Sequence, residues 1–317
     1  MRGLRACDAR GRAGRSLHRS VQPAPQRRRR SHGVLAESAG HTGPPHSRNP
    51  INYGAVPNGK ADDTKAIQKA IDDPSKTTVY FPAGKTFAIE GEVFLRGNIR
   101  RLIGCEAAVK GGAYARGRVE RKGGAVVVGD GSAPVVIIER MDVMYSSVEF
   151  RNETSRTVVL SSCTWPVQGP STGSGDYFLE DVVGGPFVFD NPKQNIWARQ
   201  LNTECWDDNI LNHGATLWIL GLKTEKQKIK ILTDKGGKTE LLGAHIYCTN
   251  PSPKPVLFDV ADSAATFIGV RETCWPGGDK PYDVYVRETR GGETRNLNRT
   301  ECPGNKHLPF FVSRPNL

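Results

Sequence analysis

The sequence predicts an all-β protein, a right-handed parallel β-helix with a short N-terminal capping helix. Three observations lead to this fold class. The composition is turn-rich, with 35 Gly in 317 residues and 37% hydrophobic residues. A single amphipathic helix is expected, near residue 65. After it, short β-like runs repeat at intervals of 21–26 residues.

Residues 1–49 are expected to be a disordered basic tail. Residues 1–50 hold eleven Arg against only Asp8 and Glu37, a net charge of +9 out of the total of +11. The remaining residues therefore carry about +2, by subtraction. This charge distribution argues against nucleic-acid binding by the folded domain. The tail has no run of 7–15 apolar residues after its basic start, so it does not resemble a secretory signal peptide.

The folded domain is expected to span residues 50–317 and to open with a capping helix. Asp62 and Asp63 precede the segment Lys65–Ile71, where an acidic or hydroxyl residue can cap the first helical turn. The apolar residues of that segment fall on one helical face. Thr78–Phe81 then reads as a strand that ends at the following Pro-Ala-Gly turn.

An internal repeat supplies the strongest evidence for a solenoid. The segment 195–204 aligns with 216–225, so that Trp197 falls on Trp218 and Glu204 on Glu225, each 21 residues apart. A second, shorter repeat consists of two apolar residues followed by a glycine, and it ends at Gly221, Gly243 and Gly269. The repeats are clearest over residues 177–270. One β-helix coil needs about this many residues, and stacked coils share one core. We therefore expect the two tryptophans to stack on adjacent coils.

The segment from Ile51 to Ile71 resembles the opening signature of the pectate-lyase superfamily. It carries Tyr-Gly-Ala at 53–55, Asp-Asp-Thr at 62–64 and Ala-Ile-Gln-Lys-Ala-Ile at 66–71, followed by Val-Tyr-Phe-Pro-Ala-Gly at 79–84. Asn58-Gly59 replaces the usual Gly-Asp, and Ala61 replaces the usual Thr. The resemblance extends to rhamnogalacturonase/epimerase-like proteins and exo-β-1,3-glucanases, and it covers residues 50 to about 290. It implies a β-helix that acts on, or binds, a polysaccharide in a groove along one parallel sheet.

The candidate catalytic residues are four carboxylates in the repeat region: Glu204, Asp207, Asp208 and Glu225. Closely spaced acids can supply the protonated and the ionised carboxyl that glycosidic cleavage needs. If the repeat is in register, Glu204 and Glu225 stack as like charges on adjacent coils and need a cation between them. Lys223 and Lys226 are the simplest partners, and they favour a purely structural role.

Trp206 and His213 are the candidate substrate-binding residues, because they accompany these acids. The alternative is a surface turn in which the acids are solvated and the tryptophan packs beneath them. His213 has no ligand spacing, and the Cys residues form no CxxC pair, so no metal site is predicted. The six Cys after residue 50 leave two alternatives open, disulfides or buried thiols.

The sequence thus favours a carbohydrate-active β-helix protein, a polysaccharide hydrolase or lyase. The alternative is a non-catalytic glycan-binding, structural or adhesive module, because neither the hydrolase nor the lyase constellation of the superfamily is complete. No cofactor is expected; a lyase of this fold would add Ca²⁺. The expected partner is a polysaccharide, no membrane span is predicted, and an extracellular or periplasmic location is expected.

Overall fold

The computed structural model describes residues 47–110, 124–143, 148–167, 172–226, 228–249, 256–274 and 280–313, with the side chains of 105–110 left aside. The predicted tail lies almost entirely outside these residues. The fold begins slightly before the expected boundary at residue 50. β1 (Ser47–Arg48) pairs in parallel with β3, and the buried Arg48 guanidinium donates to the Ile71 carbonyl oxygen at 3.2 Å.

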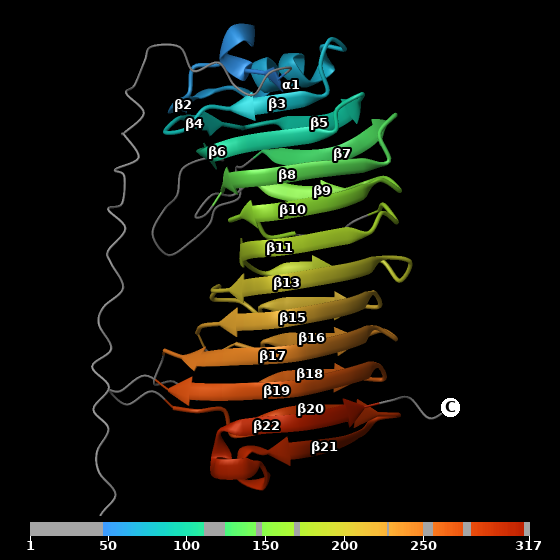
Figure 1. Ribbon diagram of the computed structural model, residues 1–317. Coiled ribbons are helices and arrows are strands. Elements are labelled where there is room, and N and C mark those ends of the chain that lie inside the picture. Colours follow the sequence, from blue (N-terminus) through green and yellow to red (C-terminus); the bar gives the residue numbers. More distant parts are fainter. Residues whose placement is uncertain are drawn as a thin grey trace, which may run out of the picture. The chain divides into compact units, whose positions relative to one another are not determined.

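The described chain forms a parallel β-helix, as the sequence predicts. In Figure 1 the strands of one sheet stack in chain order from β3 to β19. That sheet also includes β1 and ends on an antiparallel strand, β22. Its strands are β1 (Ser47–Arg48), β2 (Asn58–Asp62), β3 (Thr78–Phe81), β4 (Thr86–Ala88), β6 (Arg101–Lys110), β8 (Val135–Asp142), β10 (Thr157–Cys163), β11 (Tyr177–Gly184), β13 (Asn195–Thr203), β15 (Thr216–Thr224), β17 (Lys238–Cys248), β19 (Ala264–Cys274) and β22 (His307–Ser313). We call it the main sheet.

Two smaller sheets close the coils. One is β5 (Glu92–Gly97), β7 (Ala125–Gly131) and β9 (Glu149–Asn152), and the other is β12 (Phe187–Phe189), β14 (Ile210–His213), β16 (Ile231–Asp234), β18 (Phe258–Ala261), β20 (Val284–Arg290) and β21 (Glu293–Asn298). Inward residues of all three sheets form one buried core of Val, Ile, Leu and Phe. Each coil alone could not bury this face, so stacking stabilises the fold.

The predicted capping helix is present as α1 (Thr64–Asp72), which lies beyond the first coil in Figure 1. It buries Ala66, Ile67, Ala70 and Ile71, the apolar face that the sequence indicates. Asp62 Oδ1 accepts from the Thr64 amide at 3.0 Å. Asp63 is buried and accepts from the Val56 amide at 2.6 Å and the Ala88 amide at 3.2 Å. Both aspartates therefore hold the cap together. Short 3-10 turns occur at η1 (Pro50–Tyr53), η2 (Arg299–Glu301) and η3 (Pro303–Asn305).

The glycines recur in the repeat because of the backbone conformation at their position. Gly221, Gly243 and Gly269 occupy one column of the main sheet, with φ of +80°, +77° and +68°. Gln200 takes the same place on β13 with φ of +55°. One left-handed residue per strand bends the main sheet and reverses which side chains point outward. Glycine adopts this conformation without steric penalty.

Arg156 joins successive coils from inside. Its side chain is 4% exposed and donates to four backbone carbonyl oxygens: Ala133 at 2.7 Å, Leu95 at 2.7 Å, Ile99 at 2.6 Å and Gly129 at 3.1 Å. Buried carbonyl groups need such partners, so this one residue links the turns of three coils.

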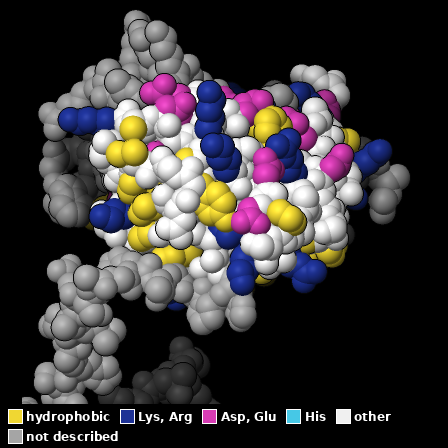
Figure 2. Space-filling model, turned by 90° about the horizontal axis from the view of Figure 1, so that it is seen from above, with side chains coloured by type: hydrophobic (Ala, Val, Ile, Leu, Met, Phe, Trp, Pro, Cys, Tyr) yellow, Lys and Arg dark blue, Asp and Glu magenta, His cyan; other side chains and the backbone are white. Residues whose placement is uncertain are grey.

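Charges of both signs intersperse on the face of the molecule that α1 covers. Figure 2, which looks down on the end that α1 covers, shows Lys and Arg side chains among Asp and Glu side chains, with apolar atoms between them. This pattern agrees with the small net charge after residue 50. In the described part of the chain, no helix is long and apolar enough to span a membrane.

Candidate functional site

An exposed row of aromatic side chains crosses the outer face of the main sheet. Phe178 on β11, Trp197 on β13 and Trp218 on β15 are register partners on adjacent strands. Phe178 and Trp197 are 43% and 36% exposed, and Trp218 is half-buried. The predicted stacking of the two tryptophans is confirmed: their ring centroids lie 5.3 Å apart with an angle of 8° between the planes. We call these three residues the aromatic row.

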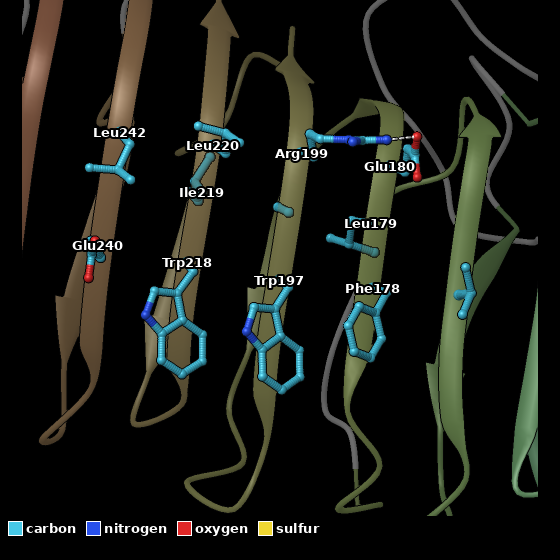
Figure 3. Close-up of a pocket in the computed structure, with 12 residues that line it drawn as sticks. Phe178, Leu179, Glu180, Trp197, Arg199, Trp218, Ile219, Leu220, Glu240 and Leu242 are labelled. Atoms are coloured by element: carbon cyan, nitrogen blue, oxygen red, sulfur yellow. Dashed lines mark hydrogen bonds and ion pairs between the residues drawn. The ribbon is translucent and has the colours of Figure 1, made fainter.

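The rings of the aromatic row stack with a lateral offset. The Phe178 and Trp197 centroids are 4.7 Å apart, at 15° between planes. Flat rings in contact are separated by only about 3.5 Å, so centroid distances of 4.7 and 5.3 Å require a lateral offset. Offset stacking is the favoured aromatic geometry. Part of each ring face stays uncovered, and Figure 3 shows the three rings side by side with their faces visible.

A second row of side chains runs beside the aromatic row, two residues further along each strand. It comprises Glu180, Arg199, Leu220 and Leu242 in register. Glu180 and Arg199 form an ion pair, and Leu220 is 56% exposed. Together the two rows line a groove of about 320 Å³, which Val159 and Glu240 bound at its two ends. The groove is open and mostly apolar, with charged groups at its edge (Figure 3).

Sequence reasoning found the tryptophan ladder but not its direction or its extent. The strand phase depends on the left-handed residue at position 200, which sequence patterns do not reveal. Phe178, Arg199 and Leu220 were missed as site residues. The signal for Phe178 was present, because Tyr177–Val182 precedes the 195–204 segment by about one coil.

The predicted acidic segment lies past the bend, away from the aromatic row. Glu204 and Glu225 follow the ends of β13 and β15, and Lys223 ion-pairs with both, at 2.6 Å from the Glu225 carboxylate. Asn202 Nδ2 also donates to Glu204 at 3.0 Å. This is the expected stacking of like charges, and it has the expected lysine partner.

The protonation of this cluster does not suit acid–base catalysis. Partial burial acts to raise the pKa of Glu204, but hydrogen bonds from Lys223 and Asn202 outweigh it and lower that pKa. Burial likewise opposes the charge of Lys223, yet its two carboxylate partners raise its pKa. A general acid needs a raised carboxyl pKa, and a lysine base needs a lowered one. The pKa of Glu204 is instead lowered and that of Lys223 is raised.

The other predicted site residues are not part of the lining of the groove. Trp206 is 64% exposed, and the Lys226 Nζ lies 4.9 Å from its ring centroid. Asp208 Oδ1 accepts from the Ile229 amide at 3.1 Å, whereas Asp207 accepts through its backbone carbonyl from Asn209 Nδ2 at 3.0 Å. His213 lies on β14, in another sheet, where its Nδ1 is 2.6 Å from an Asp234 carboxylate oxygen.

The family comparison agrees with the fold. Residues 47–162 match the family model described as Rhamnogalacturonase A/epimerase, pectate lyase-like. This part of the β-helix is therefore similar to the pectate-lyase-like family. The match covers α1 and the coils up to β10, and the aromatic row on β11–β15 lies beyond it.

The comparison with solved structures finds only distant similarity. Two solved structures similar to this chain are both of PfbA, a surface protein and adhesin of Streptococcus pneumoniae. One is 12% identical, with a TM-score of 0.34, and the match covers 77% of this chain and 89% of that one. The other is 11% identical, with a TM-score of 0.27, and covers 79% and 94%. Among curated proteins, none matched the sequence.

Proposed function

We propose that the protein binds a neutral polysaccharide along the outer face of the main sheet and does not cleave it. The observation that carries this proposal is the exposed, offset aromatic row Phe178–Trp197–Trp218. The proposal adds a ligand class to the fold and to the family similarity of residues 47–162. It also implies a location outside the cytoplasm, where such polymers are met.

The chemistry of the groove suits a sugar chain. An aromatic face carries negative charge density and attracts the positively polarised C–H groups of a sugar ring. Arg199, Glu180 and Glu240 stand at the edge of the groove, where they can exchange hydrogen bonds with hydroxyl groups. Ligand sites usually combine a mostly apolar surface with a few polar groups, as this groove does. Because the row crosses three successive strands, it can contact several sugar units of an extended polymer.

The charge of the groove favours a neutral polymer. Its lining includes one cation, Arg199, and two carboxylates, Glu180 and Glu240, for a sum of −1. Arg199 is already ion-paired with Glu180. A uronic acid polymer would bring a carboxylate to each sugar unit and would be repelled. We therefore expect β-glucans or other neutral chains to bind better than galacturonans.

Binding without cleavage follows from the state of the candidate acids. Glu204 and Glu225 hold Lys223 between them, and the lowered pKa of Glu204 and the raised pKa of Lys223 favour the charged forms of these two groups. They also lie past the bend that separates them from the aromatic row. A polymer lying on the row would not present its glycosidic bonds to these carboxylates.

The test combines binding and product analysis. The full chain is titrated calorimetrically with a panel of neutral β-glucans and galacturonans, and the same mixtures are assayed for new reducing ends and unsaturated products. We expect saturable binding of a neutral polymer, weaker binding of galacturonans, and no products. Products that disappear in Glu204→Gln would replace this proposal with a catalytic function. Failure to bind any glycan would refute it outright.

A further inference from the structure

Three potential metal ligands meet inside the last coils of the β-helix. Cys248 ends β17, Cys274 ends β19, and these two residues are register partners on adjacent strands. Glu272 lies two residues before Cys274 on β19, so its side chain faces the same side of the strand. The two sulfur atoms and a carboxylate oxygen all lie within 4.8 Å of one another.

The Glu272 carboxylate is deeply buried among neutral groups. The residue is 2% exposed. Its Oε1 accepts from the Tyr282 amide at 2.8 Å and lies 3.0 Å from Cys248 Sγ, and its Oε2 accepts from the Tyr285 hydroxyl at 2.9 Å. Within the described part of the chain, no Lys, Arg or His forms an ion pair with it. A buried carboxylate is strongly stabilised by a cation, and two adjacent thiols suit a soft one.

We propose that Cys248, Glu272 and Cys274 bind a thiophilic divalent cation, with Zn²⁺ as the best fit. Zinc accepts thiolate and carboxylate ligands at about 2.3 and 2.0–2.2 Å, which places ligand atoms about 3.6–3.8 Å apart in a tetrahedron. The three atoms are already within 4.8 Å, so side-chain adjustments suffice. Water takes the fourth position, on the side where Cys274 is partly exposed.

The charge balance of the site supports the cation. Both thiols lose a proton on binding, and two protons leave for each ion bound. The two thiolates and the Glu272 carboxylate then offset the two positive charges, with one negative charge left over. The amide of Tyr282 and the hydroxyl of Tyr285 stabilise this excess and fix the carboxylate orientation, as outer-shell donors do in metal sites. A Cys248–Cys274 disulfide would leave the buried carboxylate without any cation.

The ion would stabilise the C-terminal closure of the solenoid. The Glu272 amide donates to the Lys306 carbonyl at 2.9 Å, and the Tyr285 hydroxyl lies 3.4 Å from the Asn305 carbonyl. The site therefore links β17 and β19 to η3, which precedes the antiparallel strand β22. Binding to the folded state alone raises its stability.

The experiment uses the reduced, chelator-treated full chain with Co²⁺ and Zn²⁺ as probes. We expect one Co²⁺ per chain with thiolate-to-cobalt charge-transfer absorption, displacement by Zn²⁺, and a rise in the unfolding midpoint with Zn²⁺. Cys248→Ser and Cys274→Ser should lose the absorption. Glu272→Gln should keep it but bind at least tenfold more weakly. The matched controls Cys163→Ser, a buried thiol, and Cys205→Ser, a partly buried one, should behave as the unmodified chain.

A second measurement does not depend on folding of the variants. Zn²⁺ should protect Cys248 and Cys274, but not Cys205, from alkylation mapped by mass spectrometry. The proposal is overturned if the reduced chain binds no Co²⁺ or Zn²⁺. It is also overturned if the serine variants bind as well as the unmodified chain, or if peptide mapping of the untreated protein joins Cys248 to Cys274 in a disulfide.

Discussion

Trp197 and Trp218 stack across neighbouring coils with ring centroids 5.3 Å apart and their planes within 8° of parallel, on the outer face of the main sheet. Because these rings stack on the outside of the solenoid, they are not part of its buried core and remain accessible to a ligand. The pair extends to Phe178, so three coils present one continuous aromatic surface.

Arg156 should be among the most sensitive positions of the fold. Its replacement by Met takes the donor away from three buried carbonyl oxygens and one partly buried one. Each unsatisfied buried group costs about 1–3 kcal/mol, so we expect the free energy of unfolding to fall by at least about 3 kcal/mol. Urea denaturation measures it. Arg96→Met, which removes an exposed ion pair with Asp72, is the control and should cost no more than about 1 kcal/mol. Equal effects would refute the role of Arg156.

The left-handed column predicts opposite effects at two equivalent positions. Gly243→Ala puts a side chain where φ is +77°, with open space around the added carbon, so only backbone strain of about 1–2 kcal/mol opposes it. Gln200→Gly should stabilise the protein by about 0.5–1 kcal/mol, because relief of strain exceeds the added chain entropy. Gly243→Asn should lose less than Gly243→Ala. A stabilising Gly243→Ala in urea denaturation would contradict this account.

Lys223 gives the stability a defined pH dependence. The folded-state pKa of Glu204 lies below its ordinary 4.5, so the contribution of this group is present above pH 4.5 and is lost as the pH falls through the folded value. The pKa of Lys223 lies above its ordinary 10.5, so the lysine contributes below pH 10.5 and loses its contribution as the pH rises through the folded value.

Lys223→Met should therefore destabilise the protein most between pH 4.5 and 10.5, with the difference from the unmodified chain shrinking on both sides. Lys193→Met, at an exposed lysine, is the control and should show no such window. Unfolding midpoints recorded across the pH range give the comparison. A difference that stays constant below pH 4 would mean that the ion pairs contribute nothing.

The fold was accessible from sequence because it depends on local, repeated signals. The spacing of Trp197 and Trp218 fixed the register, and the apolar face of α1 fixed the cap. Arg48 pairs with β3 and donates to a backbone carbonyl of α1, and no sequence pattern encodes these contacts.

The site could be predicted only in part, because the sequence repeats give the register of the coils but not the direction in which each side chain points. Glu204 and Glu225 do stack as the repeat predicts, yet Lys223 forms ion pairs with both of them and Lys226 with Glu225. Whether an outward side chain lies on one face or another depends on the backbone at Gln200, a residue type that ordinarily avoids positive φ. The Cys248–Cys274 pair, 26 residues apart in the sequence, meets only because coils stack, and it is invisible to spacing rules made for short motifs.

The most direct test of the central claim is the affinity of Trp197→Ala for a neutral polysaccharide that the unmodified chain binds. The substitution removes the middle ring, against which a sugar unit packs, and takes away the stacking partner of both neighbouring rings, so the dissociation constant should rise about tenfold or more, equivalent to about 1.4 kcal/mol or more. Trp206→Ala, an exposed tryptophan outside the groove, should bind as the unmodified chain does. If Trp197→Ala folds normally and binds with unchanged affinity, the aromatic row is not the binding surface.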